Sequence, residues 1–221
     1  MSVWEILIKY YPAFFSGLSV TLKLCGIIWG LGIVLGTALG FLGWKFARSI
    51  GWPSRGVSFF LGGVPLLVFL FWLHYPVQAM FDVVIDPFFT AAFTLTIVNM
   101  FGVADIVRGS LNDFPQQYLI AAKVTGLSRR QTIFKIQIPL ILRQILPSLI
   151  FLQVAMLHTS LFASLISVEE IFRVAQRINA QIYRPVEIYT ALGVFFLGVC
   201  LPINALAYWL RRRFTRDMSE R

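Results

Sequence analysis

Five long apolar runs, separated by short polar stretches, most constrain how this chain can fold. Each is long enough for a helix to cross the hydrocarbon core of a bilayer. Because a spanning segment must satisfy its backbone groups internally, these runs predict transmembrane helices rather than an open sheet. Charged residues are 13% of the chain, about half the share found in soluble domains. We therefore expect an all-α integral membrane protein.

The boundaries of the spans follow from the ends of the apolar runs. We expect spans at about residues 14–44, 57–75, 87–107, 138–167 and 188–210. Together they form one transmembrane domain, residues 13–213, with a polar loop at residues 108–138 and a tail at residues 214–221. Residues 1–12 are rich in aromatic side chains and predict an interfacial segment, which Pro12 separates from the first span.

The distribution of basic residues predicts the orientation. With the N-terminus outside, 14 of the 19 Lys and Arg residues fall in the inner segments and four in the outer ones. By the positive-inside rule, the N-terminus lies outside and the C-terminus in the cytoplasm. The net charge of +9 does not indicate nucleic-acid binding, because the charges form clusters between apolar runs rather than one soluble basic face.

The polar stretch from Ala104 to Pro147 carries helix and turn signals. Pro115 suits the first turn of a helix over Gln116–Val124, which Gly126 can end in a left-handed conformation. Ser128 can cap a second short helix over residues 131–137, which Pro139 closes. We expect a helix, a turn and a helix at the cytoplasmic membrane surface.

The order of residues in this stretch resembles the EAA loop of ABC importer permeases. The match rests on Ala121-Ala122, Gly126, Ile138-Pro139 and Leu146-Pro147. The upstream run of residues 104–109 looks like the version found in permeases for polar amino acid uptake. Weaker likenesses to the same family occur at Gly17 with Thr21, Leu22 and Leu24, at residues 64–67, and at residues 158–161 with 168–170.

The resemblance implies a type I importer permease that has five spans in a bacterial inner membrane and one cytoplasmic loop that docks on an ATPase subunit. In that family, residues 115–139 would be the cytoplasmic helix that couples the permease to an ATPase. The matching positions are Ile120, Ala121, Ala122, Lys123, Gly126, Arg129 and Pro139. The chain is then a transport subunit rather than an enzyme, and its substrate is an amino acid or a small relative.

The resemblance also implies the partners. They are a second permease subunit, two ATPase subunits, an extracytoplasmic substrate-binding protein and membrane lipid. The sequence has no phosphate-binding loop of the G-x-x-x-x-G-K-[ST] type, so we expect ATP and Mg²⁺ on the ATPase chain. No cofactor or metal site is expected in this chain.

Several positions depart from the family pattern, among them Gln117-Tyr118 in place of its Gly-Gln and Asp105 in place of its more usual Glu. Ile120 stands where the EAA loop has its glutamate, Gly62 where the second span has an arginine, and His158 where the fourth has a lysine. The missing glutamate and the missing arginine favour a heterodimer, in which a partner subunit carries the usual charges. A homodimer with altered substrate choice is the competing interpretation.

Several residues are candidates for the substrate path. They are Pro65, Asp105, Arg108, His158, Thr159 and Ser160. A histidine at bilayer depth is either functional or a neutral residue hydrogen-bonded between helices, and both interpretations stay open for His158. Asp105 and Arg108 are three residues apart, which favours an ion pair near the membrane surface over a gate at the inner mouth.

Other features have a packing interpretation beside a functional one. The glycines at Gly32, Gly36 and Gly40 form a small-residue stripe, which indicates close packing within the subunit rather than a subunit interface. The break at Gly62, Gly63 and Pro65 faces the transport path or is a packing kink. Glu169 and Glu170 are expected to be solvated at the outer surface, with contact to a binding protein as the alternative.

Two other functions remain open at this point. One is a transport-inactive scaffold or regulatory subunit, which the degenerate docking residues would favour. The other is an ion-coupled transporter, which normally needs carboxylates inside the membrane. Asp105 is the candidate for that role and lies near the end of a span, so this function ranks last.

Overall fold

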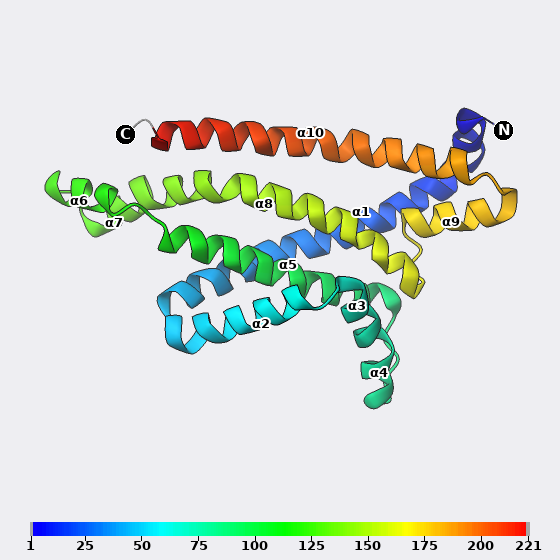
Figure 1. Cartoon of the computed structure of the whole chain (residues 1–221), viewed down its shortest axis with the longest axis horizontal. Helices are drawn as coiled ribbons and strands as arrows, with labels where there is room; N and C mark the ends of the chain where they lie inside the picture. Colours follow the sequence, from blue (N-terminus) through cyan, green and yellow to red (C-terminus); the bar gives the residue numbers. More distant parts are fainter. Residues whose placement is uncertain (1, 220–221) are drawn as a thin grey trace.

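The computed structural model describes residues 2–219, with side chains to residue 214, and all its regular elements are helical. They are α1 (Val3–Lys45), η1 (Ala47–Gly51), α2 (Trp52–Gly63), α3 (Leu66–His74), α4 (Pro76–Met80), α5 (Pro87–Asn112), α6 (Gln116–Val124), α7 (Arg129–Thr132), η2 (Ile133–Gln137), α8 (Ile138–Ser160), η3 (Leu161–Ile166), α9 (Ile171–Ile182) and α10 (Pro185–Ser219). The long helices lie side by side, with the chain termini at opposite ends of the bundle (Figure 1).

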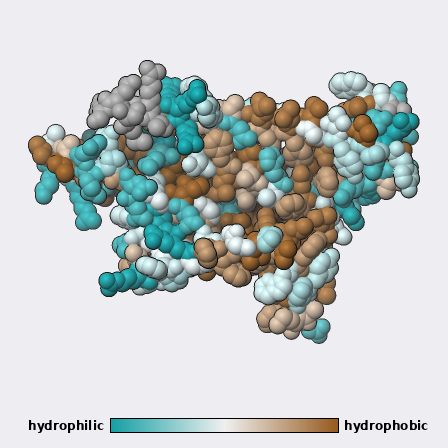
Figure 2. Space-filling model, in the orientation of Figure 1, coloured by the Kyte–Doolittle hydropathy of each residue, from teal (hydrophilic) through white to brown (hydrophobic). Residues whose placement is uncertain are grey.

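Four continuous helical stretches are long and apolar enough to cross a membrane. They cover Val3–Lys45, Pro87–Asn112, Arg129–Ile166 and Pro185–Phe214. A fifth crossing would be a bent pair, Ala47–Gly63 and Leu66–Met80, whose two parts meet at 99°. Figure 2 shows apolar side chains gathered across the middle of one face, with hydrophilic ones toward both ends, as a bilayer requires. The all-α membrane fold is therefore confirmed.

The first helix is longer than the sequence indicated. Ser2 and Glu5 form a capping box, in which the Glu5 amide donates to Ser2 Oγ at 3.3 Å and the Ser2 amide to Glu5 Oε2 at 3.0 Å. The helix therefore begins at Val3 and continues through Pro12. The prediction that Pro12 separates an interfacial segment from the first span does not hold. The proline removes only one backbone donor, and the long helix around it tolerates the loss.

The glycine stripe of α1 packs against α5 of the same chain. A Cβ at Gly32 would meet the side chain of Asn99 at 2.3 Å, and one at Gly36 would meet the Met100 carbonyl oxygen at 2.5 Å. At Gly40 the Ala104 carbonyl oxygen would lie 2.7 Å away. The two backbones approach this closely only because the side chains are missing, which confirms the prediction of packing within the subunit.

A polar pair holds the middle of the bundle together. Asn99 on α5 donates to the Ile28 carbonyl at 2.9 Å and to Gln153 Oε1 at 3.0 Å. Gln153 on α8 donates back to Asn99 Oδ1 at 3.2 Å. This reciprocal amide pair joins α1, α5 and α8 and satisfies both side chains where water is absent.

Candidate functional site

The segment α6–α7 projects from one end of the bundle, beside the C-terminal end of α10 (Figure 1). Helix α6 ends in a Schellman motif: the Leu127 amide donates to the Ala122 carbonyl at 3.0 Å, and the Gly126 amide donates to the Lys123 carbonyl at 3.2 Å. Gly126 has φ +73°, the left-handed conformation that the motif requires. The prediction that Gly126 ends this helix is confirmed.

The second helix of the segment begins as expected but does not end there. Ser128 Oγ accepts from the Gln131 amide at 3.3 Å, and Gln131 Oε1 accepts from the Ser128 amide at 2.9 Å. This capping box confirms Ser128 as the cap. Pro139, however, does not close the helix, and that prediction is corrected.

The helix passes Pro139 by widening. Residues Ile133–Gln137 form a π-turn, in which the Ile138 amide donates to the Ile133 carbonyl, five residues earlier. A proline cannot donate to the carbonyl four residues before it, and its ring crowds that carbonyl. The wider turn relieves the crowding, so one helical stretch runs from Arg129 to Ile166. The segment is thereby tied directly to a membrane-spanning helix.

The predicted docking residues are divided between two faces of the segment. Ile120 is 64% exposed and Val124 is 82% exposed, although both side chains are apolar. Ala121, Lys123, Gly126 and Arg129 are also exposed, and Pro139 is half-buried. Ala122 is buried within this chain, so its small size serves internal packing. The exposed surface of α6 thus includes the apolar side chains of Ile120, Ala121 and Val124.

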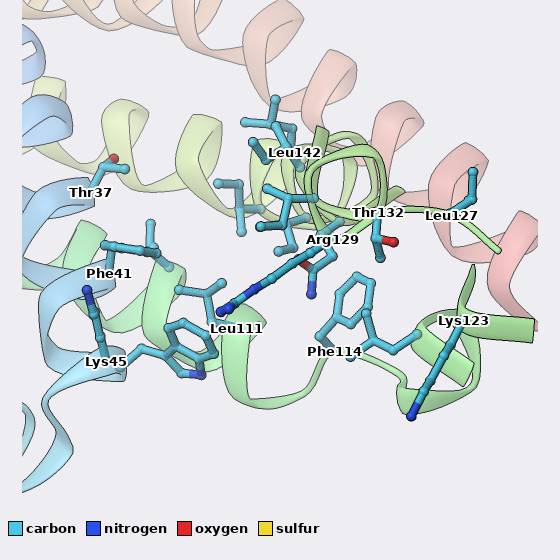
Figure 3. A pocket seen from close by; sticks show the side chains of 18 residues that line it. Thr37, Phe41, Lys45, Leu111, Phe114, Lys123, Leu127, Arg129, Thr132 and Leu142 are labelled. Carbon is cyan, nitrogen blue, oxygen red and sulfur yellow. The ribbon is translucent and has the colours of Figure 1, made fainter. Parts of the chain in front are cut away.

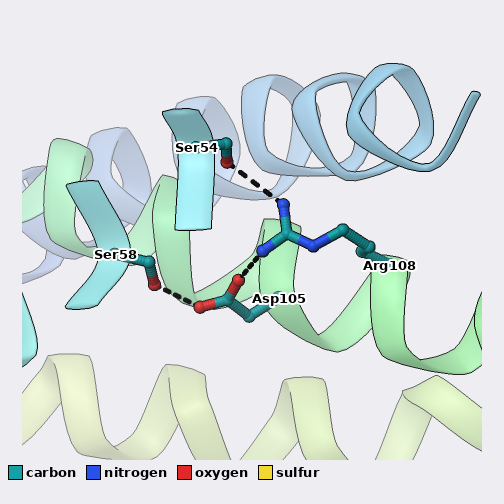
Figure 4. A network of polar contacts seen from close by, with 4 residues as sticks. All are labelled: Ser54, Ser58, Asp105 and Arg108. Carbon is teal, nitrogen blue, oxygen red and sulfur yellow. Dashed lines mark hydrogen bonds and ion pairs between the residues drawn. The ribbon is translucent and has the colours of Figure 1, made fainter. Parts of the chain in front are cut away.

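Asp105 and Arg108 form the expected ion pair on α5, and two serines of α2 extend it (Figure 4). Arg108 Nη1 donates to Ser54 Oγ at 3.2 Å, and Ser58 donates to Asp105. The Arg108 side chain is buried, whereas Asp105 remains partly exposed. This network ties α2 to α5, which favours the ion pair over a mobile gate at Arg108.

The helix break lies where the sequence placed it. Val64 is extended, Pro65 precedes α3, and the 99° bend turns the chain away from α2. Pro65 is exposed, and a Cβ at Gly62 or Gly63 would meet nothing within 4 Å. The break is therefore open to its surroundings rather than packed as a kink inside this chain.

The three polar residues near the end of α8 point in different directions. His158 is exposed, with Nε2 3.2 Å from Cys200 Sγ on α10. Ser160 is buried near Cys25 on α1, and the Thr159 hydroxyl donates to the Met156 carbonyl at 3.0 Å. Among the described residues, no recorded contact joins His158 to Asp105 or Arg108. The structure therefore brings together only the Asp105–Arg108 part of the predicted path.

The prediction for Glu170 differs from the structure. The expectation of a solvated carboxylate is wrong for this residue, because its side chain is fully buried. Its Oε1 accepts from the Arg173 amide at 2.8 Å, capping α9, and the Thr21 hydroxyl of α1 lies 3.4 Å from its Oε2. Burial raises the pKa of Glu170 to about 7, although these hydrogen bonds act in the opposite direction.

A sequence signal for this arrangement existed. Ile171, Val174, Ala175 and Ile178 have the spacing of one apolar helical face, and Glu170 stands at the position of an N-cap. The neighbouring Glu169 behaves differently: it is exposed and pairs with Arg177 at 3.0 Å. The two adjacent carboxylates therefore have separate roles, one in the fold and one at the surface.

The comparisons with known proteins agree with this architecture. The family model described as "Binding-protein-dependent transport system inner membrane component" matches residues 32–216. The glutamine transport system permease protein GlnP of Escherichia coli K12 is 31% identical over 217 residues, covering 95% of this chain and 96% of that protein. The L-cystine transport system permease protein TcyB of Bacillus subtilis is 25% identical, covering 98% and 93%.

Solved structures show the same fold. A crystal structure of an amino acid ABC transporter with histidines has a TM-score of 0.82 at 26% identity, covering 94% of this chain and 96% of that one. The MetNI methionine ABC transporter in inward-facing conformations has a TM-score of 0.70 at 16% identity, which shows likeness of fold. The chain therefore belongs to the family of inner-membrane components of binding-protein-dependent transport systems.

Proposed function

We propose that this chain forms half of the translocation pathway of an ATP-driven importer for amino acids or small relatives. Relatives that match over nearly the whole chain are named as permeases for glutamine, octopine and L-cystine. Pairing with a second permease subunit completes the pathway, and a heterodimer is favoured because Ile120 and Gly62 replace two charged residues of the family pattern. ATP and Mg²⁺ belong to two ATPase subunits, and an extracytoplasmic binding protein delivers the substrate.

The observation that carries this proposal is the exposed apolar surface of α6. Ile120 and Val124 lie outside the bundle, on a helix whose C-terminal end is fixed by a Schellman motif and followed directly by a capped helix. Exposing these side chains to water costs free energy, which a protein partner can recover by covering them. The continuous helix from Arg129 to Ile166 then passes movement of the docked segment into the membrane domain.

The test is co-expression of this chain with its neighbouring genes and copurification of an ATPase subunit, followed by ATPase assays in proteoliposomes with binding protein and amino acids. Ile120→Asp places a charge in the proposed interface and should weaken ATPase binding at least about tenfold, as expected for a central contact. Gly126→Asp disturbs the left-handed turn and should do the same. Val84→Asp is the matched control, because Val84 is fully exposed outside the docking segment.

The alternatives give different results. A transport-inactive scaffold would bind the ATPase without transport of any amino acid. An ion-coupled transporter would move substrate without ATP, but the carboxylate of Asp105 already pairs with Arg108, which disfavours that role. Equal binding of the ATPase to Ile120→Asp, Gly126→Asp and wild-type chain would overturn the docking proposal.

A further inference from the structure

A groove of about 1080 Å³ lies between α1, α5, α8 and the α6–α7 segment, at the end of the bundle from which α6 projects (Figure 3). We call it the inner groove. Its walls are mainly apolar, with Phe41 and Trp44 from α1, Leu111 from α5 and Ile141 from α8. An elongated apolar group of suitable width would find dispersion contacts along this lining.

Three cations surround this apolar lining, and each comes from a different helix. They are Lys45 at the end of α1, Lys123 on α6 and Arg129 on α7. In Figure 3 the Arg129 side chain reaches across the middle of the groove, while Lys45 and Lys123 lie at opposite sides. Among the described residues, no carboxylate lines the groove. The site therefore favours a ligand that is negatively charged at one end and apolar along the rest.

The exposed apolar contacts proposed for docking and the lining of the groove come from different residues of α6. Leu119 and Lys123 line the groove, whereas Ile120 and Val124 are exposed and do not. Leu119 and Lys123 are four residues apart and share one face of the helix, whereas Ile120 and Val124 share the adjacent face. A partner protein can therefore cover Ile120 and Val124 while the groove holds a ligand of its own.

We propose that the inner groove binds one anionic phospholipid. The phosphate lies at Arg129 in the middle of the groove, where Lys45 on one side and Lys123 on the other add to the positive potential, and an acyl chain follows the wall formed by Phe41, Leu111 and Ile141. Basic pockets between membrane helices bind anionic headgroups in this way, and Trp44 suits the headgroup level of a bilayer. A soluble phosphate compound would leave the apolar walls uncovered, so the lining favours a lipid as the occupant.

The bound lipid links the membrane domain to the docking segment. It contacts α1 and α5 on one side and α6 and α7 on the other, so its occupancy restrains how α6 sits against the bundle. Lipid binding needs no ATP and no ATPase subunit. Its failure would therefore leave the proposed transport function untouched, and failure of ATPase docking would leave the lipid site untouched.

The test is native mass spectrometry of the full chain, with any copurifying subunits, titrated with phosphatidylglycerol or with zwitterionic phosphatidylcholine. We expect tight binding of one phosphatidylglycerol. The double variant K45Q/R129Q should bind it about 30-fold more weakly, since each basic residue near an anionic surface contributes roughly a fivefold factor. The matched control R48Q/R130Q removes two neighbouring charges that do not line the groove and should bind as wild type.

A second variant tests the apolar part of the site without changing charge. Leu111→Trp fills the groove and should reduce phosphatidylglycerol binding, while the far side of the bundle is unaffected. Equal retention of the two lipids, equal loss in both double variants, or unchanged binding in Leu111→Trp would each overturn the proposal. So would cross-linking of a polypeptide from another subunit to a photoreactive residue at Leu142, which lines the groove.

Discussion

The two ends of the helical bundle differ in how far their residues pack against other parts of this chain. At the end that holds the N-terminus, α9 closes on α1: a Cβ at Gly17 would lie 2.8 Å from Val174 Cγ2, and Glu170 is buried beside Thr21. At the other end, α6 leaves Ile120 and Val124 exposed, and the inner groove stays open beside it. The contact of α9 with α1 is made within this chain, so changes to it should act on stability. The other end leaves groups for partners, so changes there should act on binding.

The largest effect is expected where α9 packs on α1. Gly17→Leu would drive atoms into Val174 and into the Ile171 backbone, 3.0 Å from the added Cβ. Backbone cannot yield as a flexible side chain does, so we expect roughly 3 kcal/mol or more of destabilisation, the upper end for overpacking. Thermal unfolding in detergent measures it.

Gly26→Leu is the control for this change, because a Cβ at Gly26 meets nothing within 4 Å in this chain. Equal loss of stability in both variants would mean that α1 does not depend on its contact with α9.

The next effect concerns the charge of Glu170, which lies outside the membrane-spanning helices. Its pKa rises from 4.5 in a free chain to about 7 in the fold, so the folded state holds the proton more tightly. Stability should therefore be greatest below about pH 4.5, fall as pH rises towards 7, and change no further above it. The loss is at most on the order of 3 kcal/mol.

Glu170→Gln keeps the shape and an accepting oxygen while removing the titration. Thermal unfolding at pH 5 and pH 8 should show a clear difference for the wild-type chain and a much smaller one for the variant. A wild-type chain as stable at pH 8 as at pH 5 would show that ionising the buried Glu170 carboxylate does not destabilise the folded state.

A smaller effect is expected at the cap of α7. Ser128→Ala removes the oxygen that accepts from the Gln131 amide, at a cost of about 1 kcal/mol. Hydrogen exchange at the Gln131 amide should become faster. Ser128→Asp keeps an accepting oxygen and should exchange like wild type; rapid exchange in that variant would argue against the cap.

The smallest effect on stability sharpens the contrast between the two ends. Ile120→Asp should change the free energy of unfolding by less than about 0.5 kcal/mol, because this exposed side chain supports little of the fold. The same change should strongly weaken ATPase binding. A large loss of stability from Ile120→Asp would show that α6 is needed for folding, and the two ends would no longer differ.

Local sequence signals predicted local structure well. Gly126 ended α6 and Ser128 capped α7, since each motif is completed by residues within a few positions along the chain. The i, i+3 spacing of Asp105 and Arg108 predicted their pairing for the same reason. Pro139 misled, because the helix could widen into a π-turn and accommodate it, which a local breaker rule does not include.

Distant contacts explain the failures. Glu169 and Glu170 are neighbours in an equally polar stretch, yet only Glu170 meets Thr21, which is 149 residues away. Thr159 and Ser160 follow His158 directly, but the helical turn and the packing of α1 and α10 send them to different surroundings. The inner groove needs four helical parts of the chain at once, so no single sequence pattern marks it.

The sequence by itself determined that this chain is helical, which runs are apolar enough to cross a membrane and where the α6–α7 segment turns, because these features depend on hydropathy, caps and glycines within each segment. Only the tertiary structure decided which helix fills the glycine stripe of α1, that the pair Ala47–Gly63 and Leu66–Met80 bends by 99°, and that Glu170 is buried. Those outcomes depend on side chains brought together from remote parts of the chain, whose contacts are fixed by packing rather than by local propensity.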